Sequence, residues 1–161
     1  MNDFLHHVRF NRWATFRTLD SVRPLSADVL AKDLQGSYGG VRGTLAHIYM
    51  ADKIWWARLM GHPTGALSEY EPPADKDAWE QQWRQLLDGY VTWAEGLPEA
   101  EWGRVIAYKD VKGNPYQSPT WQILAHLANH DSYHRGQVAA MLRQLGHTPV
   151  GTDLILYYRG L

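Results

Sequence analysis

A long helical repeat near the C-terminus constrains the fold more than any other feature of this 161-residue sequence. From about Pro119 to Leu145, every third or fourth residue falls on one helix face. Seven positions share that face: Ile123, Leu127, His130, His134, Val138, Met141 and Leu145. Five of these are aliphatic or methionine, so the face is predicted to pack into a core. Four polar residues lie elsewhere on the turn and are predicted to be exposed: Asn129, Ser132, Arg143 and Gln144.

The two histidines on this apolar face need polar partners, because an unpaired buried polar group costs roughly 1–3 kcal/mol. His130 and His134 are four residues apart, so their rings lie one above the other on the helix. A His-x-x-x-His pair of this kind can bind one metal ion. Two separately hydrogen-bonded core histidines would produce the same spacing, and the spacing alone leaves both interpretations open.

His126 is not expected to complete a three-histidine site on the same helix. It lies eight residues before His134, which corresponds to about 12 Å of helix rise. The ligand nitrogens around one ion lie within about 4 Å of each other. A third ligand is therefore expected from a different helix, and His126 is predicted to lie beside the site or at an interface.

Composition excludes several classes of function. The formal net charge is −1 and no basic block is present, which disfavours nucleic-acid binding. No apolar run approaches the ~18 residues needed to span a membrane. The absence of cysteine excludes disulfides, cysteine nucleophiles and thiolate metal ligands. The segment from Met1 to His7 lacks the basic start and apolar core of a secretory signal. We therefore expect a cytoplasmic protein, with residues 1–161 forming one domain.

Four amphipathic helices are expected, over about residues 2–22, 41–60, 78–97 and 119–145. The third carries an aromatic-rich core stripe made of Trp79, Trp83, Leu86, Tyr90, Trp93 and Leu97. Residues 103–118 are predicted to form a short hairpin or extended loop, and the apolar tail at 152–158 to pack back on the helices. The fold class is therefore all-α, a four-helix bundle with a long crossover connection.

Local signals place the ends of these helices. Gly61 is predicted to end the second helix, and Asp77, with Glu80 three residues on, to cap the start of the third. Ser118 and Pro119 are typical of the N-cap and first position of the last helix.

The second helix contains a histidine and an acid at informative positions. His47 lies on a seam with Thr44, Ala51 and Ile54, beside the apolar stripe, and periodicity alone does not force it inward. Asp52 lies on the apolar stripe itself, which is unusual for a carboxylate.

Two segments resemble motifs of the DinB-like (DinB/YfiT) family. The segment Gly39-Gly-Val-Arg-Gly-Thr-Leu-Ala-His47-Ile-Tyr-Met-Ala-Asp52-Lys-Ile-Trp55 is similar to its second-helix motif. The segment His130-Asp-Ser-Tyr-His134-Arg-Gly-Gln137 is similar to its His-x-x-x-His-Arg-Gly-Gln motif. The order of elements and the C-terminal tail also fit, so the resemblance covers nearly the whole chain.

The resemblance implies a four-helix bundle, typically a homodimer, with a divalent metal held by three histidines. Carried over position by position, the ligands are His47, His130 and His134. Zinc or nickel is the first choice, with iron and manganese also compatible with imidazole ligands. No catalytic residue is assigned.

Three classes of function follow from this resemblance. The leading hypothesis is a metal-dependent transferase that uses a low-molecular-weight thiol or acts on a small electrophilic substrate. One alternative is a metal-dependent hydrolase that uses metal-bound hydroxide. The other is a non-catalytic metal-binding module related to stress.

Several polar residues are expected to support the site, because a metal-bound histidine usually donates its second nitrogen to a polar partner. The candidates are Asn11, Asp52, His126 and Gln137. Asp52 is also expected to pair structurally, with Arg12 as the suggested partner. Asp131 and Arg135 are expected to form a surface ion pair or a dimer contact.

Overall fold

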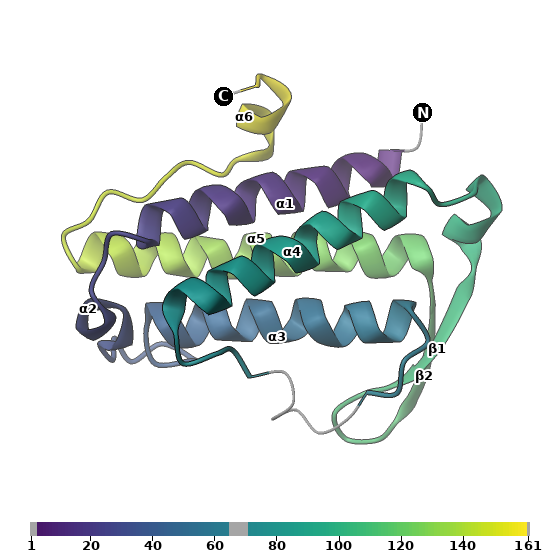
Figure 1. Cartoon of the computed structure of the whole chain (residues 1–161), viewed down its shortest axis with the longest axis horizontal. Helices are drawn as coiled ribbons and strands as arrows, with labels where there is room; N and C mark the ends of the chain where they lie inside the picture. The colour runs from purple at the N-terminus through teal and green to yellow at the C-terminus, as the bar shows by residue number, and fades with distance from the viewer. Residues whose placement is uncertain (1–2, 65–70, 161) are drawn as a thin grey trace.

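Four long helices form a bundle in the computed structural model, which describes residues 3–64 and 71–160 (Figure 1). They are α1 (Asp3–Val22), α3 (Val41–Leu59), α4 (Lys76–Glu95) and α5 (Thr120–Gln144). Helices α1 and α5 run in one direction, and α3 and α4 run in the other (Figure 1). Helix α5 packs along both α1 and α3, whereas α4 packs mainly on α1. The predicted all-α bundle is confirmed.

The connections explain why parallel neighbours occur in this bundle. Because α3 and α4 run the same way, the chain between Met60 and Asp75 has to return from one end of the bundle to the other. This is the predicted long crossover, although residues 65–70 lie outside the described residues. A short helix, α2 (Ala27–Ala31), lies between α1 and α3, outside the four predicted helices. Ser26 caps it by accepting a hydrogen bond from Val29 N.

The predicted hairpin before the last helix is confirmed. Strands β1 (Val105–Lys109) and β2 (Pro115–Pro119) pair antiparallel, after a short 3₁₀ helix, η2 (Glu99–Gly103). The turn is held by Asp110, whose Oδ1 accepts hydrogen bonds from Lys112 N and Asn114 N. Gly113 adopts a φ of 86°, which a side chain would disfavour.

Two of the three predicted helix boundaries are corrected by the structure. Gly61, with a φ of 70°, follows α3 as predicted. Helix α4 is capped by Asp75, which accepts a hydrogen bond from Ala78 N at 2.7 Å, so Asp77 was the wrong cap. Ser118 and Pro119 belong to β2, because strand pairing with Val105 and Ile106 extends the chain up to Thr120.

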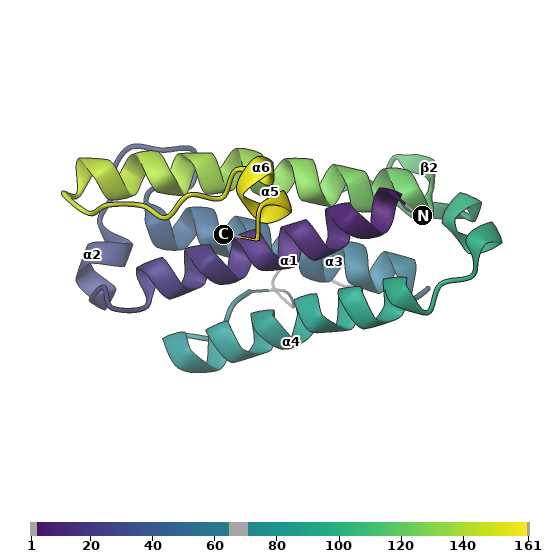
Figure 2. The same ribbon diagram turned by 90° about the horizontal axis from the view of Figure 1, so that it is seen from above.

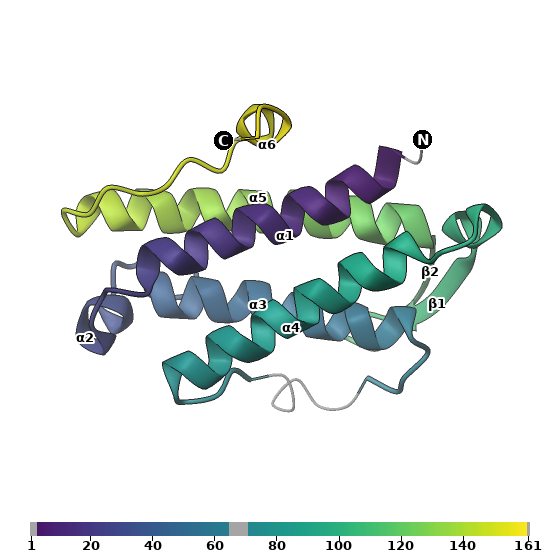
Figure 3. The ribbon, with the colours of Figure 1, turned by 45° about the horizontal axis from the view of Figure 1, so that its top comes forward.

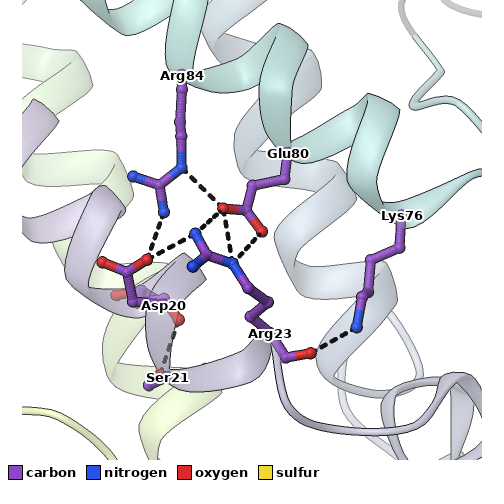
Figure 4. A network of polar contacts seen from close by, with 7 residues as sticks. Asp20, Ser21, Arg23, Lys76, Glu80 and Arg84 are labelled. Atoms are coloured by element: carbon purple, nitrogen blue, oxygen red, sulfur yellow. Dashed lines mark hydrogen bonds and ion pairs between the residues drawn. The ribbon is translucent and has the colours of Figure 1, made fainter.

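Glu80 joins α4 to the end of α1 instead of closing a capping box (Figure 4). Its carboxylate binds Arg23, the residue that follows α1, and Arg84 from its own helix, and Asp20 receives hydrogen bonds from both arginines. Asp20 and Arg23 are about half-exposed, so their ion pair adds little stability, whereas Glu80 and Arg84 are more enclosed.

Burial follows the predicted face on α5 and follows it only in part on α4. On α5 the apolar positions of the predicted face are buried or half-buried, and the four polar residues predicted to be exposed are exposed. On α4, Trp79, Trp83 and Tyr90 are buried as predicted, whereas Leu86, Trp93 and Leu97 are half-buried, and the neighbouring Leu87 and Ala94 are buried. Helix α1 lies between α5 and α4 in the view of Figure 2, and α4 contacts α1 more extensively than it contacts α3.

The C-terminal tail packs on the outer side of the bundle, as expected. Helix α6 (Leu154–Tyr158) lies against α1, with the Tyr157 ring 5.9 Å from Phe10 and 5.6 Å from Trp13 (Figure 3). None of its residues is fully buried. Among the described helices, none has both the length and the apolar character that crossing a bilayer requires.

Candidate metal centre

Three histidines from two helices converge between α3 and α5. His47 comes from α3, and His130 and His134 come from α5, one turn apart. One nitrogen of each ring lies within 4.8 Å of the other two, and the Nε2 atoms of His47 and His130 are 3.0 Å apart. His134 is buried, and the other two rings are half-buried. The three residues named by resemblance are therefore brought together in a group that could hold a metal ion.

Hydrogen bonds on the far side of two rings fix which nitrogen carries the proton. His130 Nδ1 lies 3.1 Å from Asp131 Oδ1, and His134 Nδ1 lies 2.8 Å from Gln137 Oε1. Carboxylate and amide oxygens only accept hydrogen bonds, so each Nδ1 donates and each Nε2 keeps its lone pair. This is the tautomer that metal-binding histidines use, with the second nitrogen held by a polar partner.

Electrostatics keep the third ring neutral. Burial, helped by the neighbouring His130 and His134 and opposed by Asp131, lowers the pKa of His47 from 6.5 to about 4. A histidine must be neutral to bind a metal, so this environment prepares His47 for ligation at pH 7. Three neutral imidazoles fit a zinc, nickel or iron ion well and a magnesium or calcium ion poorly.

A tyrosine that sequence reasoning missed covers the site. The Tyr38 ring stacks on His47 with centroids 4.0 Å apart and an interplanar angle of 15°. Its hydroxyl oxygen lies 3.1 Å from His47 Nε2, the nitrogen that faces the other histidines. Tyr38 lies in the turn before α3, outside any periodic face. The signal that could have found it is the run of glycines at 36, 39 and 40, only a few residues before His47.

A buried polar network lies behind His130. Asp131 Oδ2 accepts a hydrogen bond from Asn11 Nδ2 at 2.5 Å, and Asn11 Oδ1 accepts one from Arg135 at 2.7 Å. Arg135 also donates to Thr15 on α1 and to Ser132 on α5. Asn11 therefore supports the site through Asp131, without touching a ligand histidine itself.

The predicted surface ion pair or dimer contact of Asp131 and Arg135 is wrong. Asp131 is 0% exposed and Arg135 is 3% exposed, because α1 covers this side of α5. Burial lowers the pKa of Arg135, while the nearby carboxylates of Asp131 and Asp52 raise it. The positive charge of Arg135 and the negative charge of Asp131 therefore compensate each other within the core.

Asp52 is a second buried acid in the same region, and its suggested pairing with Arg12 is wrong. Its Oδ2 accepts a hydrogen bond from Trp83 Nε1 at 2.8 Å, while Oδ1 has no partner among the described residues. Arg12 instead binds Asp88 at the surface, because α1 directs it towards α4. Burial, together with the charge of Asp131, raises the pKa of Asp52 well above its usual range, which favours the protonated acid.

His126 lies beside the group without joining it, in agreement with the spacing argument. Its ring packs edge-on against Trp55 and tilted against His130, with centroids 5.6 Å away in both cases. Partial burial lowers the pKa of His126, and the adjacent His130 adds to this effect.

Comparison with known proteins agrees with the fold and the order of elements. The family model described as "DinB family" matches residues 1–160. Protein DinB of Bacillus subtilis (strain 168) is 22% identical over 165 residues, covering 98% of this chain and 95% of that protein. The crystal structure of a DinB-like protein from Bacillus cereus superposes with a TM-score of 0.68 at 23% identity, covering 92% of this chain and 94% of the other. With a family model matched along nearly its entire length, the chain belongs to the DinB family.

Proposed function

We propose that this protein binds one divalent metal ion through His47, His130 and His134 and acts as a metal-dependent transferase. The substrate would be a small electrophile, and the co-substrate a low-molecular-weight thiol. The observation that carries the proposal is the convergence of three imidazoles whose outer nitrogens are held by Asp131 and Gln137. That pairing leaves the Nε2 lone pairs of His130 and His134 available to bind an ion, as a metal site requires.

The bound ion would supply charge that favours loss of a proton from a thiol or a water molecule. The chain's own residues have narrower roles. The three histidines bind without adding negative charge, so the centre stays strongly electrophilic. Asp131 and Gln137 orient the rings, and Tyr38 restricts access from solvent. Since the chain has no cysteine, a reacting sulfur has to come from the co-substrate.

Zinc or nickel is the proposed metal, with iron and manganese compatible with the same ligands. A homodimer in the cytoplasm is the accompanying expectation. A light-scattering mass near that of the 18.5 kDa chain at working concentration would contradict the dimer.

The test begins with elemental analysis of tag-free protein, in which about one divalent ion per chain is expected. A panel of small electrophiles is then incubated with and without low-molecular-weight thiols, and thioether products are measured. Product that requires both thiol and metal, and that disappears in His130→Ala, supports the proposal. Turnover of ester or amide substrates without any thiol would replace the transferase with a hydrolase. Metal binding with no turnover in either panel would reduce the protein to a binding module.

A further inference from the structure

We propose that Tyr38 supplies a fourth donor atom to the histidine centre: its phenol would lose its proton to solvent when a metal ion binds, and the phenolate oxygen would close the resting site. The inference rests on the proposed metal site and extends it to a residue outside both motifs. Any thiol or substrate that binds at the centre would then have to displace the Tyr38 phenolate, which would take a proton back from the incoming ligand or from solvent.

Distances place the phenol oxygen where a ligand would lie. It is 3.1 Å from His47 Nε2, which is itself 3.0 Å from His130 Nε2. Ligand atoms bound to one tetrahedral ion at about 2.0–2.2 Å lie roughly 3.3–3.5 Å apart. Both distances are therefore close to the spacing of neighbouring ligands. The Tyr38 ring also meets His134 edge-on at 5.6 Å, so it contacts rings from both ligand helices.

Metal binding would compete for the nitrogen that Tyr38 now contacts. A metal ion at the centre would occupy the lone pair of His47 Nε2, the atom that lies 3.1 Å from the Tyr38 hydroxyl oxygen, and that oxygen has lone pairs of its own to offer the ion. Once that lone pair is used, the hydroxyl loses its partner. The parallel stacking of the two rings at 4.0 Å keeps the oxygen beside the centre, where the ion is the nearest new partner.

The backbone is shaped to hold Tyr38 in this place. A Cβ on Gly43 would lie 1.9 Å from the carbonyl oxygen of Tyr38, and one on Gly40 would lie 2.1 Å from that of Lys32. Gly39 has a φ of 76°, which closes the turn directly after Tyr38. Only glycine at position 43 lets the backbone of Tyr38 lie this close to α3. This close approach keeps the Tyr38 ring within reach of His47.

The hydroxyl is also able to leave. Tyr38 is 39% exposed, so its ring can turn towards solvent without opening the core. A closed resting site that a ligand opens by displacement would protect the centre from unselected ligands.

The experiment compares wild-type protein, Tyr38→Phe and Tyr133→Phe, each loaded with copper(II) as a spectroscopic probe that imidazole sites accept. Tyr133 is the matched control, because its ring contacts His134 edge-on at 5.0 Å yet is 66% exposed. A visible phenolate-to-copper charge-transfer band is expected in wild type and Tyr133→Phe and should be absent in Tyr38→Phe. Zinc affinity, measured by chelator competition, should fall about tenfold or more in Tyr38→Phe alone.

The outcomes separate this inference from the proposed function. If wild type binds zinc, His130→Ala abolishes binding, and Tyr38→Phe matches wild type in both spectrum and affinity, the tyrosine inference is overturned and the histidine centre stands. If wild type binds no divalent metal, both are overturned. Thermal melting of the metal-free variants checks that each is folded, which loss of a single hydroxyl is expected to permit.

Discussion

His134 Nδ1 lies 2.8 Å from Gln137 Oε1, one helical turn further along α5. Replacing Gln137 by Leu would leave this ring free to rotate and its outer nitrogen without an acceptor. Zinc affinity is expected to fall about 10–100-fold, the usual effect of removing such a partner. Chelator competition measures the change. Gln144→Leu, on an exposed position of the same helix, is the matched control and should bind like wild type. Equal affinities for the two variants would contradict the role given to Gln137.

Removing a ligand should have a larger effect than removing a neighbouring histidine. His130→Ala is expected to lose the metal from the purified protein, because the two remaining imidazoles cannot form the three-ligand centre. His126→Ala should keep it, since His126 packs on His130 without belonging to the group. Elemental analysis after dialysis checks both, and metal retained by His130→Ala would show that the ion binds elsewhere.

The two buried acids should respond differently to the same substitution. Asp131→Asn leaves the buried charge of Arg135 without its carboxylate and is expected to lower the free energy of unfolding by roughly 3–5 kcal/mol. Asp52→Asn is expected to stay within about 1 kcal/mol of wild type, because the amide mimics a protonated acid and still accepts from Trp83. Urea denaturation of metal-free protein at pH 7 measures both. Equal losses would mean that Asp52 is ionised as well.

The stability of the metal-free protein should depend on pH through His47. Its pKa is lowered from 6.5 to about 4 in the folded protein, so the unfolded chain binds more protons between those values. The free energy of unfolding should therefore fall as the pH is lowered from about 6.5 to about 4. His47→Gln removes this contribution and should lose less stability over the same window. The comparison uses chemical denaturation with chelator present, and His62→Gln, at an exposed position, should follow wild type. Parallel curves for wild type and His47→Gln would refute the assignment.

The helices could be predicted from the sequence because each long helix carries a repeating apolar face. The histidine pair on α5 was visible for the same reason: polar rings stood where the repeat required core residues. The third histidine was not, since His47 lies beside its helix's apolar stripe, and only the family resemblance selected it.

The wrong predictions share one physical cause. They concern contacts between different elements, and the sequence pattern of a single helix or strand does not contain such contacts. Periodicity finds the most apolar face of α5 but not the additional covering by α1, and so Asp131 and Arg135 looked exposed. Ser118 and Pro119 carry good helix-start chemistry, yet pairing with β1 decides their conformation. Tyr38 lies in a turn, where position depends on glycine geometry rather than on a repeat.

The contact between His47 and His130 joins positions 83 residues apart in the sequence. In a chain without cysteine, an ion shared across that contact would act as a removable staple between α3 and α5. Separating the two helices would first require the ion to depart, so unfolding would become slower as the metal is held more tightly. The lifetime of the folded protein would then follow the supply of metal in its surroundings.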